Sequence, residues 1–282
     1  MKPIPSKEAT DRFQEINGVK LHYNELGSGP TLICTHGGGP GANAWDNTKW
    51  IFAELAEHFH TILLDTPGYG ESQKYVSRDG VPMDIFVSKF LIGLMDHLGI
   101  DRAHLHGSAQ YAPAVVRTAI DYPDRVGKLI ITCSGIGDPI PGAPERSGRA
   151  PGLESLNIFA DNPTRENMVK TMQFFTKRPE FRTDAIVDAR FQAALREGVI
   201  ESRREMKSSS NSNLQPEIHK LKSESLILWG NEDNVTFVDH ALRALYNMPK
   251  SRAIIFGDQS GHFVFQEHPE DCAHYIIDFL KL

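Results

Sequence analysis

Residues 103–122 read AHLHGSAQYAPAVVRTAIDY, and this stretch decides how the rest of the chain is interpreted. The pattern predicts a short strand over 103–106, a sharp turn at Gly107 and a helix over about 110–122. A strand that turns at once into a helix is the repeating unit of a parallel sheet covered by helices. The stretch therefore predicts an α/β protein whose sheet is buried on both faces.

The same alternation continues on either side of this stretch. Upstream, residues 12–35 read as strands and carry Asn17-Gly18, a two-residue hairpin signal. Residues 84–98 have apolar side chains at helical spacing. Together these segments predict a mostly parallel eight-stranded sheet with helices on both faces. The other predicted strands are 61–65, 128–132, 225–229 and 252–256, and the other predicted helices are 47–58, 237–247 and 269–281.

The alternation stops near residue 135 and resumes only at 225–229. In between, the chain is first rich in Pro and Gly (136–155) and then charged and helical, with no strand pattern (163–206). A long insertion of this kind is usually functional. We predict three segments, namely a first core part, a helical lid and a second core part, at residues 1–135, 136–210 and 211–282.

Bulk composition narrows the classes of function. The 282 residues carry a formal net charge of −6 with a pI of about 6.1, so charge gives no support for a nucleic-acid partner. No apolar run approaches the roughly 20 residues that span a bilayer, and the first residues lack a signal-peptide pattern, so we expect no membrane partner. Three isolated cysteines predict a reduced, cytoplasmic protein, small buried thiols and no metal site: Cys34, Cys133 and Cys272.

The turn after the strand at 103–106 resembles a G-x-S-x-G nucleophile elbow. In that motif the middle residue sits on a strained strand-to-helix turn, and small neighbours two positions away allow the backbone to bend. The middle position here is Ala109, which cannot attack a carbonyl, and Tyr111 stands where glycine is usual. A shifted register would make Ser108 the nucleophile, but its neighbours two positions away are bulky. We favour Ala109 as the nucleophile position, and an ordinary turn remains the alternative.

A glycine-rich loop, His36 to Gly41, follows an earlier strand. Glycines allow a backbone to approach a ligand closely and to aim its N–H groups at it. With the N–H of Gln110 at a helix N-terminus, such a loop would hold a developing oxyanion. A phosphate-binding loop is disfavoured, because no Gly-Lys-Ser/Thr follows the glycines and no G-x-G-x-x-G spacing is present. A flexible loop without function remains the alternative.

Two further residues stand after strands in the second core part. Asp233 follows the strand at 225–229, with Glu232 and Asp239 as nearby competitors, and His262 follows the last strand in a glycine-containing turn. The ligand crevice of open α/β sheets lies at the carboxyl ends of the strands. The order of positions 109, 233 and 262 is that of the nucleophile, acid and base in the α/β-hydrolase fold. In that reading the imidazole takes the proton of the nucleophile and the carboxylate fixes its tautomer.

The sequence now resembles the meta-cleavage product hydrolases, over nearly the whole chain. These enzymes cleave a carbon–carbon bond in ring-opened products of aromatic degradation. The segment HGGGPGA at 36–42, followed by Trp45 to Asn47, is similar to their oxyanion loop, and Leu156 to Ala160 and the segment around Arg190 also match. The resemblance implies a small-molecule 2-hydroxy-6-oxo-2,4-dienoate as substrate, no cofactor and a homo-oligomer.

The resemblance also implies roles for individual residues. Ser108 stands where the family usually has Asn, and Phe263 where it usually has Trp; with Tyr111, these departures bear on the shape of the pocket. A guanidinium suits the carboxylate end of a dienoate, because it pairs with a carboxylate through two hydrogen bonds. The implied oxyanion donors are the amides of Gly38 and Gln110, and the implied substrate-binding residues are Gly39, Asn47, Ser108, Arg190 and Phe263.

Ala109 leaves three interpretations open. We favour a Ser→Ala change that inactivates a serine-type hydrolase and spares substrate binding. A natural enzyme that uses His262 with water, or with dioxygen as cofactor-free dioxygenases do, is the second, and a non-catalytic ligand receptor is the third. An esterase or lactonase is the nearest hydrolytic rival, and it would need neither Arg190 nor Asn47 for a carboxylate.

Overall fold

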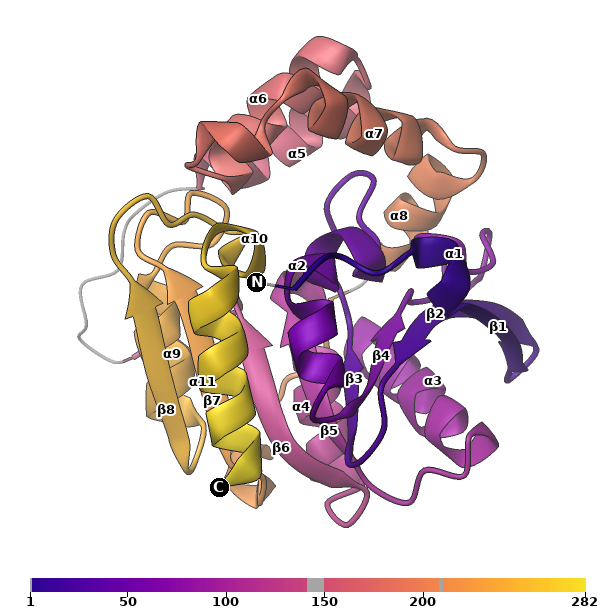
Figure 1. The fold of residues 1–282 in the computed structure, drawn as a ribbon, viewed down its shortest axis with the longest axis vertical. Helices are drawn as coiled ribbons and strands as arrows, with labels where there is room; N and C mark the ends of the chain where they lie inside the picture. Colours follow the sequence, from indigo (N-terminus) through magenta and orange to yellow (C-terminus); the bar gives the residue numbers. More distant parts are fainter. Residues whose placement is uncertain (1, 141–149, 208–209) are drawn as a thin grey trace.

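The computed structural model describes residues 2–140, 150–207 and 210–282. Parts of the predicted lid segment, 141–149 and 208–209, lie outside the described residues. These residues form an eight-stranded sheet in the order β1-β2-β4-β3-β5-β6-β7-β8 (Figure 1). The strands are β1 Asp11–Ile16, β2 Val19–Leu26, β3 Thr31–Cys34, β4 His60–Leu64, β5 Ala103–Ser108, β6 Val126–Thr132, β7 Ser225–Gly230 and β8 Ser251–Phe256.

Pairing within the sheet changes direction near one edge. β2 runs antiparallel to β1 and to β4, and all other neighbours are parallel. The β1–β2 hairpin closes on Asn17 and Gly18, whose φ angles of 51° and 76° fit the type I′ turn that the sequence predicts. The central strands carry near-continuous buried apolar residues, because helices cover both of their faces. The predicted fold class is confirmed.

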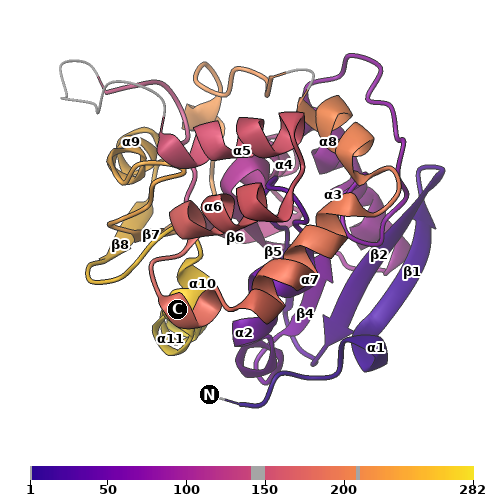
Figure 2. The same ribbon diagram turned by 90° about the horizontal axis from the view of Figure 1, so that it is seen from above.

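Helices cover the sheet on both faces. α2 and α11 pack together on one face, and α3, α4 and α9 lie on the other (Figures 1 and 2). The ends of elements differ from the predicted ranges by three residues at most; α2, for example, starts at Ala44 because Asn43 accepts a hydrogen bond of 2.7 Å from the N–H of Asp46. The bounds are α1 Lys7–Thr10, α2 Ala44–Ala56, α3 Met83–His97, α4 Ala112–Asp121, α9 Asp239–Asn247, α10 Val264–Glu267 and α11 Pro269–Lys281.

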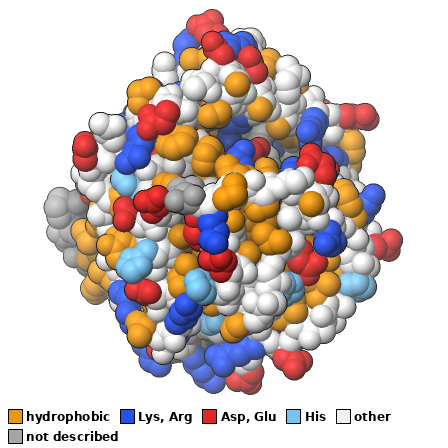
Figure 3. Space-filling model, in the orientation of Figure 1, with side chains coloured by type: hydrophobic (Ala, Val, Ile, Leu, Met, Phe, Trp, Pro, Cys, Tyr) orange, Lys and Arg blue, Asp and Glu red, His pale blue; other side chains and the backbone are white. Residues whose placement is uncertain are grey.

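Four helices, here called the helical cover, lie across the carboxyl ends of the strands (Figure 1). Three of them, α5, α6 and α7, pack through an apolar cluster of their own that includes Phe159, Met168 and Met172. Figure 3 shows a hollow between the cover and the sheet, with Lys and Arg side chains inside it. The cover consists of α5 Pro151–Asp161, α6 Arg165–Phe175, α7 Asp184–Leu195 and α8 Val199–Lys207. The exact division at 136 and 210 stays a prediction. Within the described ranges, no helix has the length and apolar character needed to cross a membrane.

Candidate active site

The turn between β5 and α4 has the strained geometry expected of a nucleophile elbow. Ala109 has a φ of +45°, whereas Ser108 is extended with a φ of −107°. A positive φ is uncommon for a residue other than glycine. Gly107 permits the bend, because a Cβ there would lie 2.6 Å from the Cα of Ala112. The backbone therefore singles out position 109, rather than 108, as the elbow residue.

Tyr111 does not occupy the cavity beside the elbow. Its side chain is fully buried, and its ring packs edge-on against the rings of His36 and Tyr69 at centroid distances of 5.2 and 5.6 Å. Burial raises the pKa of the Tyr111 phenol well above its ordinary value. The bulky residue that departs from the elbow pattern thus fills space behind the glycine loop.

His262 and Asp233 form a buried pair. His262 Nδ1 lies 2.7 Å from Asp233 Oδ2, and Asp233 Oδ1 accepts hydrogen bonds from the N–H groups of Val235 and Thr236 at 2.7 and 3.0 Å. The carboxylate follows β7, and the imidazole lies in the loop between β8 and α10. With every carboxylate oxygen engaged, Asp233 is held in place to orient the ring.

The loop that carries His262 is tied to the helical cover. The N–H of His262 donates to the carbonyl of Phe175 at 2.8 Å, and the two rings meet edge-on at 5.1 Å. Glu267, a buried carboxylate, accepts hydrogen bonds from Gly261 N–H at 2.6 Å and from Thr176 Oγ1 at 2.7 Å. Burial raises the pKa of Glu267 although these hydrogen bonds oppose the shift. Sequence reasoning missed Glu267, which no motif marks.

Hydrogen bonds orient the peptides of the glycine loop. His36 Nε2 accepts from Thr66 N–H at 3.1 Å, so the proton of the neutral ring is assigned to Nδ1, which donates to Gly37 O at 2.6 Å. Burial lowers the pKa of His36, which favours this neutral form. In a trans peptide the N–H points opposite to the C=O. The N–H of Gly38 is therefore turned away from His36.

The next peptide of the loop is held from the cover. Arg203, on α8, donates from Nε to the carbonyl of Gly38 at 3.0 Å, and Tyr69 Oη donates to the same oxygen at 3.3 Å. The N–H of Gly39 is thereby turned to the opposite side. Across the described residues, the N–H groups of Gly38 and Gly39 have no hydrogen-bond acceptor. Both glycines line a cavity, so their amides are available to a ligand.

Arg190, on α7, is buried, and the nearest counter-charge is the carboxylate of Asp46, which partly opposes the effect of burial on the pKa of Arg190 without forming an ion pair with it. Its guanidinium stacks over the rings of Phe263 and Phe175 at 5.1 and 5.7 Å from the centroids. Its Nε has no hydrogen-bond partner, and among the described residues the side chain forms no ion pair. Burial lowers the pKa of Arg190 to about 10, so the group stays protonated at neutral pH. A buried, unpaired cation is costly, and an anionic ligand would relieve that cost.

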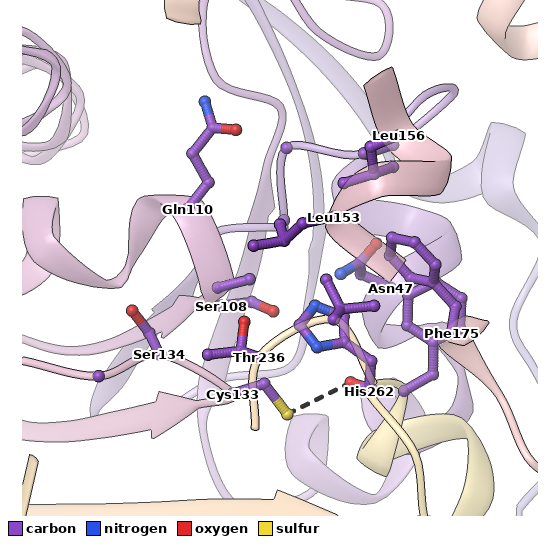
Figure 4. Close-up of a pocket in the computed structure, with 18 of the residues that line it drawn as sticks. Asn47, Ser108, Gln110, Cys133, Ser134, Leu153, Leu156, Phe175, Thr236 and His262 are labelled. Atoms are coloured by element: carbon purple, nitrogen blue, oxygen red, sulfur yellow. Dashed lines mark hydrogen bonds between the residues drawn. The ribbon is translucent and has the colours of Figure 1, made fainter. Parts of the chain in front are cut away.

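One cavity of about 430 Å³ brings these groups together. Asp233 is not part of its wall and supports His262 from behind. In Figure 4 the His262 ring lies between Ser108 on one side and Phe175 on the other, and the Gln110 side chain points away from that ring. Its amide lies against Gly38, where a Cβ would come within 1.7 Å of Gln110 Oε1. The predicted site residues on the cavity wall are Gly38, Gly39, Asn47, Ser108, Ala109, Gln110, Arg190, His262 and Phe263.

Cys133 is a wall residue that the sequence analysis treated only as packing. It is buried and free, follows β6 with a φ of +50°, and donates from Sγ to the carbonyl of His262 at 3.3 Å. Its ligand atom lies within 4.8 Å of those of Asp233 and His262, as a metal site would require. Because burial raises the pKa of Cys133 well above its ordinary value, the thiol stays protonated. The expectation of no metal stays a prediction.

The chain is similar to known hydrolases over nearly its whole length. A family model described as the alpha/beta hydrolase fold matches residues 30–269. A 2-hydroxy-6-oxononadienedioate/2-hydroxy-6-oxononatrienedioate hydrolase of Burkholderia vietnamiensis is 30% identical over 99% of this chain and 98% of its own length. A 2-hydroxy-6-oxo-6-phenylhexa-2,4-dienoate hydrolase of Comamonas testosteroni is 30% identical over 98% of this chain and 96% of its own length.

Solved structures agree on the fold. A variant of a meta-cleavage product hydrolase from Pseudomonas fluorescens has a TM-score of 0.84 at 24% identity, with 96% of this chain and 97% of the other covered. A 2-hydroxy-6-oxo-6-phenylhexa-2,4-dienoate hydrolase from Rhodococcus has a TM-score of 0.83 at 21% identity, with 96% and 98% covered. At these identities the likeness supports the fold alone.

Proposed function

The chain belongs to the α/β-hydrolase fold family and, within it, to the 2-hydroxy-6-oxo-dienoate hydrolases; from this premise we propose that its cavity binds such a dienoate for serine-type cleavage of the C5–C6 bond. We propose further that Ala109 occupies the place of the serine nucleophile, so that this chain binds the substrate without turnover. One observation carries the proposal: the elbow residue Ala109, the buried Arg190 and His262, which Asp233 holds from behind, border the same cavity.

The substrate would lie with its carboxylate and 2-hydroxy group at Arg190 and Asn47. Arg190 offers a rigid, fully charged donor set in a desolvated place, where a bidentate carboxylate contact is strongest. Gly39, Phe263 and Ser108 would line the dienoate. The C6 carbonyl would then reach position 109, with its oxygen facing the amides of Gly38 and Gln110.

With serine at position 109, the reaction would have two stages. His262 first assists the proton movement that converts the dienol into the keto form. Serine Oγ then attacks C6 while His262 accepts its proton, and the C5–C6 bond breaks as its electron pair forms an enolate conjugated with the C2 carbonyl. Water releases the acyl group. The products are 2-hydroxypenta-2,4-dienoate and a carboxylic acid.

The test is to restore the hydroxyl. Ala109→Ser should bleach the yellow chromophore of a 2-hydroxy-6-oxo-dienoate at a rate about 10⁴- to 10⁶-fold above that of the Ala109 chain. Ala109→Gly is the matched control, because it alters the same side chain without adding a nucleophile, and it should stay inactive. If the serine form leaves dienoates intact but hydrolyses simple esters no faster than the alanine form does, the proposal is wrong.

A further inference from the structure

The wall of the cavity carries basic side chains and no acidic ones among its described residues. Its described residues include two arginines and two histidines and no aspartate or glutamate. Arg190 accounts for one end. The other basic pair, Arg243 and His240, belongs to α9, which follows β7, whereas the glycine loop follows β3. A cavity with basic groups in two places favours a ligand with two negative charges.

The two basic places lie on opposite sides of His262. In Figure 4, Phe175, over whose ring Arg190 stacks, lies to one side of the imidazole, and Ser134 lies to the other. Gly135 follows Ser134, and a Cβ on it would lie 2.7 Å from His240 Nδ1. The glycine therefore leaves room for this imidazole beside the end of β6. In the same view Ser108, the neighbour of position 109, lies between Ser134 and the His262 ring.

The Arg243 side chain is held in place by a hydrogen bond to the main chain. Its Nε donates to the carbonyl of Gly137 at 2.5 Å, which fixes the guanidinium beside the cavity. Among the described residues Arg243 forms no ion pair, and its side chain is half-buried. Most surface arginines can rotate their side chains out into the solvent. The Arg243 guanidinium is held at the cavity wall, so a carboxylate can bind it with little further ordering of the side chain.

We propose that Arg243, assisted by His240, forms a second anion subsite for a carboxylate at the far end of the C6 substituent. The inference rests on the proposed function, because it takes the first carboxylate to sit at Arg190 and C6 to sit at position 109. The substituent then extends past Val235 and Thr236 toward α9. The preferred substrates are thus dienedioates, which carry a carboxylate at each end, over 6-phenyl dienoates.

The experiment uses the Ala109 chain, in which ligands bind without turnover, and measures dissociation constants by calorimetry. The three ligands are 2-hydroxy-6-oxonona-2,4-dienedioate, its 9-methyl ester and 2-hydroxy-6-oxo-6-phenylhexa-2,4-dienoate. Arg243→Gln should weaken binding of the dienedioate about tenfold and change the other two less than twofold. Arg243→Lys should recover part of the loss, since it keeps the charge. Arg252→Gln, an exposed arginine on β8, is the matched control.

The outcomes separate this inference from the proposed function. Equal loss for all three ligands in Arg243→Gln, or no loss for the dienedioate in a variant with unchanged melting temperature, overturns the subsite and leaves the dienoate function standing. If no dienoate binds the parent chain, the proposed function fails and the subsite fails with it. Arg190→Gln should weaken all three ligands, which marks the common end.

Discussion

The loops at the strand ends and the helical cover contribute different kinds of group to one cavity. The loops hold theirs through main-chain hydrogen bonds: Asp233 is fixed by two amides, and the peptides of the glycine loop by His36 and its neighbours. The cover supplies Arg190 through packing alone, with an Nε that has no partner. Under the proposed function, the loops would set reactivity and the cover would set recognition, so the two could change independently.

The largest effect should come from the loops. In an Ala109→Ser background, Asp233→Asn should lower kcat about 10⁴-fold, because the imidazole loses its preferred tautomer and its counter-charge. Dienoate affinity of the Ala109 chain should change little. Stopped-flow loss of the dienoate chromophore measures the first quantity and calorimetry the second. Glu232→Gln, the neighbouring exposed acid, is the control; an equal loss there would mean that the loop, rather than the pair, is responsible.

A substitution in the cover should have the opposite effect, with weaker ligand binding and little change in reactivity. Arg190→Gln should weaken dienoate binding by about 30- to 100-fold, the equivalent of roughly 2–3 kcal/mol for a charge-assisted pair. Hydrolysis of a neutral ester by the Ala109→Ser form should be nearly unchanged. Arg196→Gln, exposed just after α7, controls for charge on the cover. If ester hydrolysis falls as far as dienoate cleavage, recognition and reactivity are not separable.

Arg203 links the two regions, since it lies on the cover but holds the glycine loop by a hydrogen bond. Arg203→Met keeps the length of the side chain and removes its hydrogen bond to Gly38 O. We expect kcat in the Ala109→Ser background to fall about tenfold, less than the roughly 10²–10³ for loss of an oxyanion donor itself, with little change in affinity. Arg204→Met, its exposed neighbour, is the control. A change in affinity alone would contradict a positioning role.

The last effect concerns the pH dependence of stability, outside the site, and it belongs to the sheet. Burial lowers the pKa of His106, on β5, to about 3, so the folded state keeps this imidazole neutral while the unfolded chain protonates it near pH 6.5. Stability is therefore lost as pH falls from about 6.5 toward 3, at up to about 1.4 kcal/mol per pH unit for this group. His106→Gln should flatten the curve in urea titrations, whereas exposed His274→Gln should not. The cover contains no histidine.

Sequence reasoning recovered the elements and the motifs that adjoin them. Alternating apolar strands and helices predicted the sheet, and Ala109, Asp233 and His262 were found because each follows a strand at a recognisable turn. Their catalytic roles stay proposals. The short helices α1 and α10 were missed, since four residues carry no periodic signal.

The groups that the sequence did not reveal act across long separations. Arg203 reaches Gly38 over 165 positions, and Glu267 reaches Thr176 over 91. Only the packing of the cover on the sheet places these partners together, and no local pattern records it. The sequence did not identify Arg243 for the same reason. It is one helical arginine among many, and only the fold places it beside the cavity.

The positive φ of Ala109 has a genetic consequence. The backbone at this position already has the shape that a serine there would need, and it is kept by Gly107 and the surrounding helix rather than by a hydroxyl. Alanine and the TCN codons of serine differ by a single base. Under the proposed function, one point mutation would separate a protein that binds its ligand from one that also cleaves it, and the backbone at position 109 would need no rearrangement in either direction.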